Sequence, residues 1–597
     1  MSRPTSFADV IYGLAPDWSA EQFLLWPPDL FALTSTLLST AGAERLIVDP
    51  PSRGDWPPNP SDLGWGDGPE LTEPTGALGF GLRVRAVAKE WREAVQTREH
   101  MSSLDDPADE SGRARATSKL PRSLCELWRL TCSQMRAPGA PPDAPLERPL
   151  TDLVAGDERA WLLLTRVATL HALADEASAL LGVTRKLSDP ATLTASFRLL
   201  ERGTLSRLDP SRGRVLPKRH NSAVGISLRA LSANLAFHRS SIAVSWHIPA
   251  MPERTSNFVF LLLPWPLTVR GSDFGSVGYS RIGSDPSRFG YFRYSPAGEG
   301  RTRLDVQLLQ QTLSAAIHEA GRVDCVVLPE GAIHESDMQL FEGVIAEQKI
   351  PIYIAGIRAT PEEGGGSTTD ALDENYVVWK SIDEGHRGRS QKKSRPLYQG
   401  IQQHKHHRWC LDAGQITQYQ LGAALTLDRL WWEGIRLHPR QVRFQNLDEE
   451  TTVVALICED LARQDPTAEL IRSVGPSLVV TVLMDGPQLA DRWSARYACV
   501  LADDPGSSVL TLTSFGMVER WSPPWRRASR VVALWKDPTA PPRELELPEG
   551  ASGLLLYASK DKRCEICADG RVEEVPTTRL IYAGSRAVHA DRSLGSR

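Results

Sequence analysis

Three residues in the C-terminal half of the chain have side chains that together suffice for acyl transfer. Glu330 ends the apolar segment VVLPE, Lys405 lies in QHKHHRW, and Cys458 follows the apolar run of LICED. A cysteine thiolate attacks a carbonyl or nitrile carbon, a carboxylate removes and returns protons, and a lysine cation stabilises the oxyanion. We therefore predict Glu330, Lys405 and Cys458 as catalytic residues, with a backbone N–H near Glu459 as a second oxyanion donor.

Each of these residues also has an ordinary structural explanation. A glutamate at a strand end is commonly a cap, and a cysteine in an apolar run commonly packs in a core. A lysine among histidines is commonly on a solvated surface. Taken singly, none of the three residues therefore establishes a catalytic site.

Runs of Val, Ile and Leu predict the strands that must position these side chains. Continuous apolar runs are typical of strands buried on both faces of a sheet. The runs cover residues 258–267, 323–330, 350–360, 374–382, 453–460, 477–484 and 507–514. An amphipathic helix is expected at 304–321, and functional side chains are expected where strands end. The pattern predicts a layered α/β domain over residues 255–585.

Residues 1–240 have a different sequence pattern, which predicts a mainly α-helical accessory region. Apolar residues recur at helical spacing in 82–96 and 160–183. Segments rich in proline and glycine are expected to be loops, because proline removes a hydrogen-bond donor and glycine raises chain entropy. These loops cover residues 50–76, 102–119 and 136–149. The basic run at 211–220 is expected to be a solvated linker, with phosphate contacts as the alternative.

The composition excludes several classes of protein. The 597 residues include 68 Lys and Arg against 73 Asp and Glu, so the net charge of -5 does not fit a dedicated nucleic-acid-binding protein. Contact of a local patch with nucleic acid is left open. Eight cysteines do not make a disulfide scaffold in a chain of this length. With no secretory signal and no apolar run long enough to span a membrane, we expect a cytoplasmic protein with reduced thiols.

The motifs around the three residues resemble those of the nitrilase, or carbon–nitrogen hydrolase, superfamily. VVLPE resembles the strand that carries the family's glutamate, KHHRW its lysine segment and LICED its nucleophile elbow, in the family's order. Residues 477–487, 492–517 and 568–575 resemble later elements, the last being the family's closing strand. The resemblance implies a four-layer α-β-β-α sandwich over 255–585 and a homodimer or larger oligomer. It also implies hydrolysis of a small-molecule amide or nitrile through a cysteine thioester, with no metal or organic cofactor.

Two features depart from the family pattern. Many members have a second glutamate between the lysine and the cysteine, and that place falls on Gln420, which we expect to position Lys405 or the substrate. A neutral amide there would not offset the charge of the lysine, which puts turnover in doubt. Lys392 and Lys393 compete with Lys405 for the catalytic role, and Lys405 is preferred because the residues after it fit the family better.

The resemblance extends to nitrilase-like domains associated with reverse transcriptases in bacterial antiviral defence, which implies a defence-system partner protein. Polymerase chemistry is not expected, because Pro505 and Gly506 directly follow the paired aspartates of LADDPG. Two other functions stay open. One is a binding or sensing module on the nitrilase fold, and the other is an acyltransferase that uses the same three residues.

Smaller clusters of metal-ligating residues have ordinary explanations. His404, His406 and His407 could bind a metal, but a polar wall around Lys405 is favoured because no Cys or carboxylate lies close by in the sequence. The CEIC motif at 564–567 lacks a second pair with matching spacing and is expected to hold reduced thiols. The two tryptophans of LWWEG are expected to pack in a core or an interface.

Overall fold

The structure is a computed structural model that divides the chain into two compact units. It describes residues 5–43, 47, 56–65, 76–102, 120–137, 139–155, 157–182, 190–221, 227–239, 242–248, 256–277, 288–296, 304–360, 372–382, 398–448, 450–521, 528–573 and 576–590. The first unit comprises Met1–Trp246, Leu470–Gly475 and Lys562–Thr577, and the second comprises His247–Glu469, Pro476–Asp561 and Thr578–Arg597. Two segments from the C-terminal half of the chain therefore belong to the first unit.

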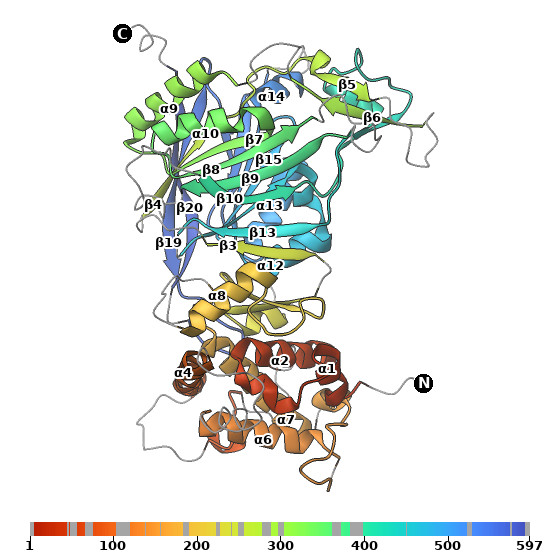
Figure 1. Ribbon diagram of the computed structural model, residues 1–597, viewed down its shortest axis with the longest axis vertical. Coiled ribbons are helices and arrows are strands. Elements are labelled where there is room, and N and C mark those ends of the chain that lie inside the picture. Colours follow the sequence, from red (N-terminus) through yellow and green to blue (C-terminus); the bar gives the residue numbers. More distant parts are fainter. Residues whose placement is uncertain are drawn as a thin grey trace. The chain divides into compact units, whose positions relative to one another are not determined.

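Helices dominate the first unit (Figure 1). They are α1 (Phe7–Leu14), α2 (Pro27–Ala41), α4 (Ala77–Ser102), α6 (Arg122–Met135), α7 (Glu158–Ala177), α8 (Pro190–Arg202) and most of α12 (Glu469–Val474). The helices expected at 82–96 and 160–183 are confirmed as α4 and α7. Every residue of α7 from Leu163 to Ala177 is buried, as in a helix that other elements cover on all sides.

Short strands follow these helices. β1 (Arg214–Pro217) and β2 (Leu235–His238) pair antiparallel, and β3 (Ala243–His247) comes next in the chain. The solvated linker expected at 211–220 is therefore wrong. Lys218 in this run is buried, and its Nζ donates to the carbonyl of Ser232 at 2.7 Å. The apolar residues within the basic run supply the buried side of β1.

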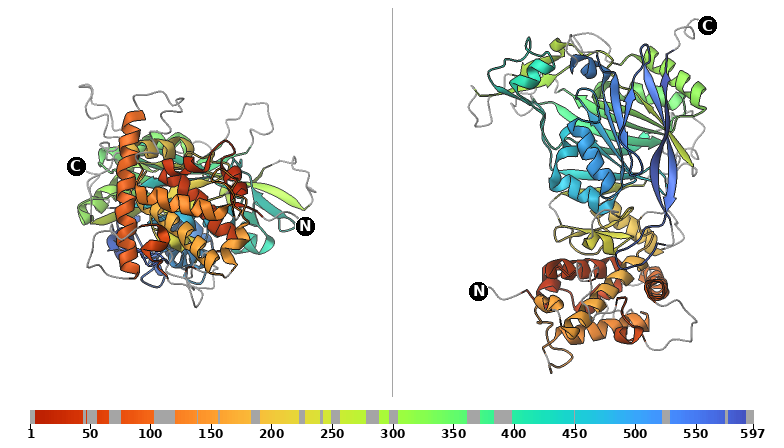
Figure 2. Two further views of the ribbon diagram at one scale, coloured as in Figure 1. Left: turned by 90° about the horizontal axis from the view of Figure 1, so that it is seen from below. Right: turned by 180° about the vertical axis from the view of Figure 1, so that it is seen from behind.

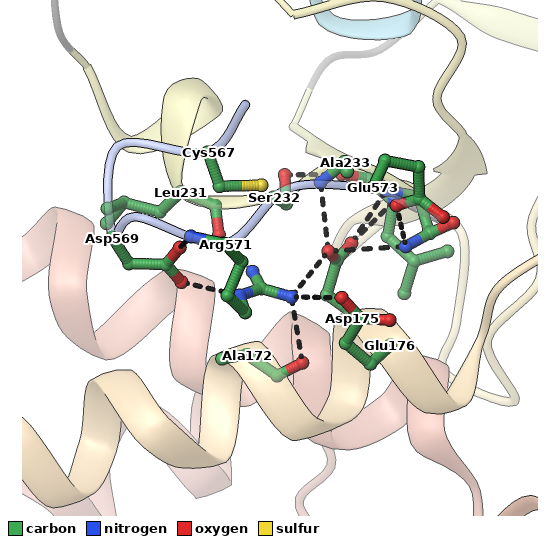
Figure 3. A network of polar contacts seen from close by, with 12 residues as sticks. Ala172, Asp175, Glu176, Leu231, Ser232, Ala233, Cys567, Asp569, Arg571 and Glu573 are labelled. Atoms are coloured by element: carbon green, nitrogen blue, oxygen red, sulfur yellow. Dashed lines mark hydrogen bonds and ion pairs between the residues drawn. The ribbon is translucent and has the colours of Figure 1, made fainter. Parts of the chain in front are cut away.

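A buried arginine holds the segment 562–577 in the first unit (Figure 3). Nε of Arg571 lies 2.7 Å from the carboxylate of Asp569, and Nη1 lies 3.1 Å from that of Glu176. Nη1 also lies 3.4 Å from Asp175. Because a buried guanidinium is costly without acceptors, these carboxylates are what allow this segment to be buried.

The closing strand expected at 568–575 is wrong. The described residues of that stretch form one isolated bridge, between Ile566 and Val572, and belong to the first unit. The last strand of the chain is β20 (Thr577–Val588) instead. An ion network rather than a sheet holds 568–573, and such a network leaves no apolar periodicity in the sequence.

The second unit contains two large sheets at its centre and one small sheet toward its edge (Figures 1 and 2). The first large sheet has the order β10-β9-β8-β7-β4-β19-β20. Its other strands are β4 (Asn257–Leu262), β7 (Cys325–His334), β8 (Ile352–Ala359), β9 (Glu374–Ile382), β10 (Tyr398–His404) and β19 (Gly553–Arg563).

The second large sheet has the order β18-β17-β16-β15-β14-β13 within this unit. Its strands are β13 (Gln441–Asn446), β14 (Thr452–Ile457), β15 (Leu478–Leu483), β16 (Ser508–Thr513), β17 (Val531–Lys536) and β18 (Arg543–Glu546). The small sheet has the order β11-β12-β6-β5, formed by β5 (Phe274–Val277), β6 (Phe289–Tyr294), β11 (Cys410–Leu411) and β12 (Leu430–Glu433).

Each predicted apolar run contains a strand. β14, β15 and β16 pair in parallel, and every residue of the three is buried, as expected for strands covered on both faces. β4, β7 and β8 also pair in parallel, whereas β9 and β10 join the same sheet antiparallel.

Hydrophobic cores lie between the layers of the second unit. Side chains such as Phe260 and Trp379 from the first large sheet meet Ile457 and Leu512 from the second. A separate core joins the first sheet to α9 (Val306–Ala320) and α10 (Met338–Glu347), which lie together over β7 and β8 in Figure 1. The remaining helices are α11 (Ala413–Gln418), α13 (Trp493–Asp503), which packs on β16 and β17, and α14 (Phe515–Trp521). The α/β fold class and the helix at 304–321 are confirmed.

All eight cysteines of the chain are free thiols. Among the residues that the structure describes, the helices lack the combination of length and apolarity needed to cross a bilayer.

Candidate active site

Cys458 follows β14 directly and has an unusual backbone conformation. Its φ angle is +47°, in the left-handed region of backbone conformation that residues other than glycine rarely adopt. Its side chain is buried, with a residue exposure of 4%. Such conformations persist where surrounding structure imposes them, and they cluster at functional sites. The parallel pairing of β14 with β15 holds the strand that delivers this thiol to the end of the sheet.

Glu330 lies within β7, where the strand is irregular. Its register with β8 shifts between Leu328 and Ile333, and Gly331 has a φ of +62°. The carboxylate of Glu330 is buried and accepts a hydrogen bond from the backbone N–H of Met484 at 2.9 Å. The bulge thus turns a strand residue toward the carboxyl end of β15.

Lys405 lies directly after β10, and its ammonium group is held between two carboxylates. Nζ lies 2.7 Å from Glu330 and 2.5 Å from Glu433. Burial by itself would lower the pKa of Lys405, but the two neighbouring carboxylates raise it well above the usual value. The backbone N–H of Lys405 also donates to Asn375 at 3.0 Å. Lys405 is therefore the lysine beside Glu330, and the alternatives at 392–393 lie outside the described residues.

Glu433 is the second glutamate beside Lys405, and Lys405, Glu330, Glu433 and Asn375 are called the lysine cluster. The assignment of the second-glutamate place to Gln420 is wrong. Gln420 donates its side-chain amide to the carbonyl of Arg520 at 3.2 Å in an exposed position. Glu433 ends β12, which pairs in parallel with β6. Because the chain makes α11 and a further loop before β12, the second glutamate comes later in the sequence than Gln420. Its signal in the sequence was an acidic residue ending the aromatic segment LWWE.

Asn375 joins the two carboxylates. Its Nδ2 lies 2.8 Å from Glu330 and 2.8 Å from Glu433. Oε2 of Glu433 also lies 3.2 Å from the backbone nitrogen of Trp409. The antiparallel pairing of β9 and β10 places Asn375 beside Lys405. No local sequence motif predicts this contact, because the two residues are far apart in the chain.

The burial of the cluster keeps the Cys458 thiol protonated at rest. Burial and the negative charge of Glu330 raise the pKa of Cys458 well above its ordinary value, while Lys405 opposes them. Burial also raises the pKa of Glu330, against the effect of Lys405. A carboxylate with a raised pKa is a stronger proton acceptor, which is what a general base beside a neutral thiol requires.

Asp460 links the lysine segment to the turn that carries Cys458. It accepts the backbone N–H of His406 at 3.1 Å and lies 2.8 Å from Nδ1 of His407. The side chain of Glu459 instead lies 2.5 Å from Arg463, away from this cluster. The oxyanion role of a backbone N–H near Glu459 stays a prediction.

A small cavity of about 20 Å³ adjoins the cluster, the size of a single water molecule. Its lining combines apolar, acidic and basic side chains. It comprises Phe292, Arg293, Tyr294, Glu330, Gly331, Arg358, Asp373, Glu374, Asn375, Glu433, Gly434, Ile435 and Met484. Arg293 is paired with Asp373 at 2.8 Å, so part of this polar wall is already neutralised.

His404 separates from the other two histidines. It lies with Glu374 and His438, and the ligand atoms of the three residues are within 4.8 Å of one another. The sequence shows no carboxylate close to these histidines, which argues against a metal site. The fold brings the carboxylate of Glu374 from β9 to His404. Of the tryptophan pair, Trp431 is buried in the core beneath the small sheet, as predicted.

Comparison with known proteins gives likenesses in structure alone. No protein-family model matches the sequence, and no curated protein matches it. Similar solved structures include Saccharomyces cerevisiae Nit3, a member of branch 10 of the nitrilase superfamily, with 13% identity, a TM-score of 0.30, and coverage of 51% of this chain and 90% of that one.

A carbon–nitrogen hydrolase from Helicobacter pylori G27 has 9% identity and a TM-score of 0.26, over 55% of this chain and 89% of that one. XC1258 from Xanthomonas campestris, a CN-hydrolase superfamily protein with an arsenic adduct in its active site, has 12% identity and a TM-score of 0.23, over 49% and 88%.

Proposed function

We propose that the second unit hydrolyses a non-peptide amide or nitrile through a thioester on Cys458. The observation that carries the proposal is the ammonium of Lys405, buried between Glu330 and Glu433 at 2.7 and 2.5 Å. A buried cation flanked by two acceptors contributes little to stability beyond what apolar packing would supply. Together with a thiol at a left-handed turn, it has the composition of a site for acyl transfer.

For an amide, Sγ of Cys458 forms a bond to the carbonyl carbon while its proton passes to Glu330. Lys405 and a backbone N–H near Glu459 stabilise the oxyanion that results. The C–N bond then breaks, and the amine leaves with the proton from Glu330. A thioester remains on the cysteine.

Water cleaves the thioester in the second half of the reaction. Glu330 accepts a proton from the water as its oxygen bonds to the acyl carbon, and the C–S bond breaks. The proton returns to sulfur and the carboxylic acid departs. The sum is amide plus water giving acid plus amine, with Glu330 and Cys458 restored.

Alkylation with sub-stoichiometric iodoacetamide, mapped by mass spectrometry on the full chain, tests the site without a known substrate. Cys325 is an internal reference, because it is fully buried and burial also raises its pKa. We expect Cys458 to react at least about tenfold faster than Cys325, because Glu330 is its base. Glu330→Gln and Lys405→Met should each slow the alkylation of Cys458 by at least about tenfold.

Glu342→Gln is the matched control, since this glutamate pairs with Lys380 at 2.7 Å in the same unit and touches none of the cluster. It should leave the rate at Cys458 unchanged. A Cys458 that reacts no faster than Cys325 in the folded wild type would overturn the proposal. An amide and nitrile screen with wild type and Cys458→Ala then identifies the substrate by release of ammonia or amine.

The raised pKa of the Cys458 thiol favours a second candidate, a binding or sensing module, because a protonated thiol is a poor nucleophile. A space of about 20 Å³ holds one water molecule rather than a substrate, so the site must open before anything larger enters. A ligand that binds tightly and is recovered unchanged from wild type would support this function. Acyl transfer to an amine acceptor uses the same residues and is distinguished by the product alone.

We also propose, from the sequence resemblance, that the chain acts as a homo-oligomer in bacterial antiviral defence with a partner protein. Light scattering of the purified chain measures its oligomeric state. Plaque assays that compare wild type with Cys458→Ala in the host test the role in defence. Equal phage resistance from both would show that the thiol is not needed for such a role.

A further inference from the structure

Two histidine rings and one carboxylate converge beside the lysine cluster, on residues that the proposed reaction does not use. Glu374 is the first residue of β9, His404 is the last of β10, and His438 lies between β12 and β13. Their side chains are part-exposed, at 24%, 26% and 31%, so that an ion from solvent can reach them. The imidazole rings lie 3.8 Å apart between centroids.

Both rings direct a nitrogen at the same carboxylate oxygen. Oε2 of Glu374 lies 2.7 Å from Nε2 of His438 and 3.3 Å from Nδ1 of His404. Nδ1 of His404 is inaccessible to solvent, and the carboxylate of Glu374 is the acidic group beside it. Arg436 lies 3.4 Å from the other oxygen, Oε1, and leaves Oε2 to the histidines.

We propose that Glu374, His404 and His438 bind a divalent transition metal ion, with Zn²⁺ as the ion that fits best. Two histidines and a glutamate, with a water in the fourth position, are a common zinc ligand set. Tetrahedral bonds of 2.0–2.1 Å place ligand atoms about 3.3 Å apart. The His404 pair already has that separation, and the His438 pair must open by roughly half an ångström.

The surroundings of His404 suit a metal ligand. The side-chain amide of Gln402 lies 3.1 Å from its second ring nitrogen, Nε2. Histidines that bind metal through one nitrogen usually donate the other N–H to an oxygen, and rotation of this amide presents its carbonyl oxygen there. The ring also packs against Tyr376, 5.5 Å between centroids, which fixes its plane.

The ion would brace the segments that position the lysine cluster. Glu374 precedes Asn375 and His404 precedes Lys405 in the chain, so each of these two ligands is adjacent to a residue of the cluster. Because neighbouring strand residues point to opposite faces, a metal on one side does not displace the contacts on the other. An ion bound only by the folded chain raises its stability.

Titration of the chelator-treated full chain with Zn²⁺ by calorimetry, and with Co²⁺ by absorption, tests the site. Co²⁺ should give the visible bands of a tetrahedral nitrogen and oxygen site, without sulfur charge-transfer bands. His404→Phe and His438→Phe keep an aromatic ring for packing, and Glu374→Gln keeps the shape of the carboxylate. Each should weaken binding at least tenfold and abolish the rise in melting temperature that Zn²⁺ causes in wild type.

His318→Ala is the control, because this exposed histidine lies on α9 and should bind as wild type. Circular dichroism establishes that each variant is folded before titration. Unchanged affinity in the three ligand variants would overturn the site. So would sulfur charge-transfer bands that Cys564→Ser removes, since the metal would then be on the exposed thiol.

Discussion

At the scale of single residues, charge compensation explains the arrangement around Lys405. A lone ammonium group is costly to bury, and each carboxylate beside it offsets part of that cost. Burial opposes ionisation of the Cys458 thiol and so does the charge of Glu330, and both raise its pKa. The resting site therefore holds its proton on sulfur, and the base rather than a preformed thiolate must start the reaction.

Replacing Glu433 with glutamine tests its influence on the base. The negative charge of Glu433 helps burial to raise the pKa of Glu330, so Glu433→Gln lowers that pKa. At low pH the rate of alkylation at Cys458 falls as Glu330 becomes protonated. This acidic limb of the pH–rate profile should move to lower pH in the variant. We expect the rate near neutral pH to fall by about tenfold, because a weaker base accepts the proton less readily. A limb that stays in place, with Glu342→Gln as the reference, would contradict the prediction.

At the scale of elements, the irregular part of β7 depends on close packing against β8. A Cβ atom at Gly356 of β8 would lie 2.4 Å from the Cα of Glu330 and 2.4 Å from the carbonyl oxygen of Pro329. These are backbone atoms and cannot rotate away. The glycine therefore lets the bulged strand approach its neighbour and sets the depth at which Glu330 enters the site.

Gly356→Ala should displace Glu330 and lower the stability of the chain. We expect the free energy of unfolding to fall by about 1–3 kcal/mol, as for other overpacked cores. Alkylation of Cys458 should slow by about tenfold or more under conditions where the variant is folded, because the base has moved. Gly422→Ala is the control, since no atom lies within 4 Å of a Cβ there. Equal effects of both substitutions would show that the close approach at β8 has no special role.

At the scale of the whole molecule, the chain crosses between its two units more than once. Residues 562–577 return to the first unit after β19 and bring buried charge with them. Glu573, labelled in Figure 3, lies 3.2 Å from the amide of Asn234. Burial and the nearby acids Glu176 and Asp175 raise the pKa of Glu573 to about 7. The stability of the first unit should therefore depend on pH.

The direction of this pH dependence follows from the fact that Glu573 binds its proton more tightly in the folded state than in the unfolded state. Its pKa is 4.5 ordinarily and about 7 in the folded unit. Its contribution to the free energy of unfolding is full below about pH 4.5 and is lost as pH rises through 7. At about 1.4 kcal/mol per pKa unit the full loss is about 3.5 kcal/mol, of which about 2.5 kcal/mol falls between pH 5 and pH 8.

Hydrogen exchange of the α7 amides, corrected for intrinsic rates, measures the effect at pH 5 and pH 8. Wild type should lose somewhat less than about 100-fold in protection, which corresponds to the loss of about 2.5 kcal/mol between these pH values. Glu573→Gln cannot ionise and should keep its protection at pH 8. Glu201→Gln, at an exposed glutamate of α8, should behave as wild type. A Glu573→Gln variant with the wild-type loss would contradict the assignment.

The sequence by itself predicted seven strands of the second unit and singled out Glu330, Lys405 and Cys458; these strands are β4, β7, β8, β9, β14, β15 and β16. Continuous apolar runs are a local property, and Glu330 and Cys458 are visible in or directly after such runs, whereas Lys405 was found through its motif. Tertiary structure alone decided the partners of those residues. Glu433 reaches Lys405 only through the pairing of β12 with β6, and Met484 reaches Glu330 only where β15 ends. The return of Arg571 to the first unit was likewise invisible, because pairing between distant segments leaves no periodicity in either one.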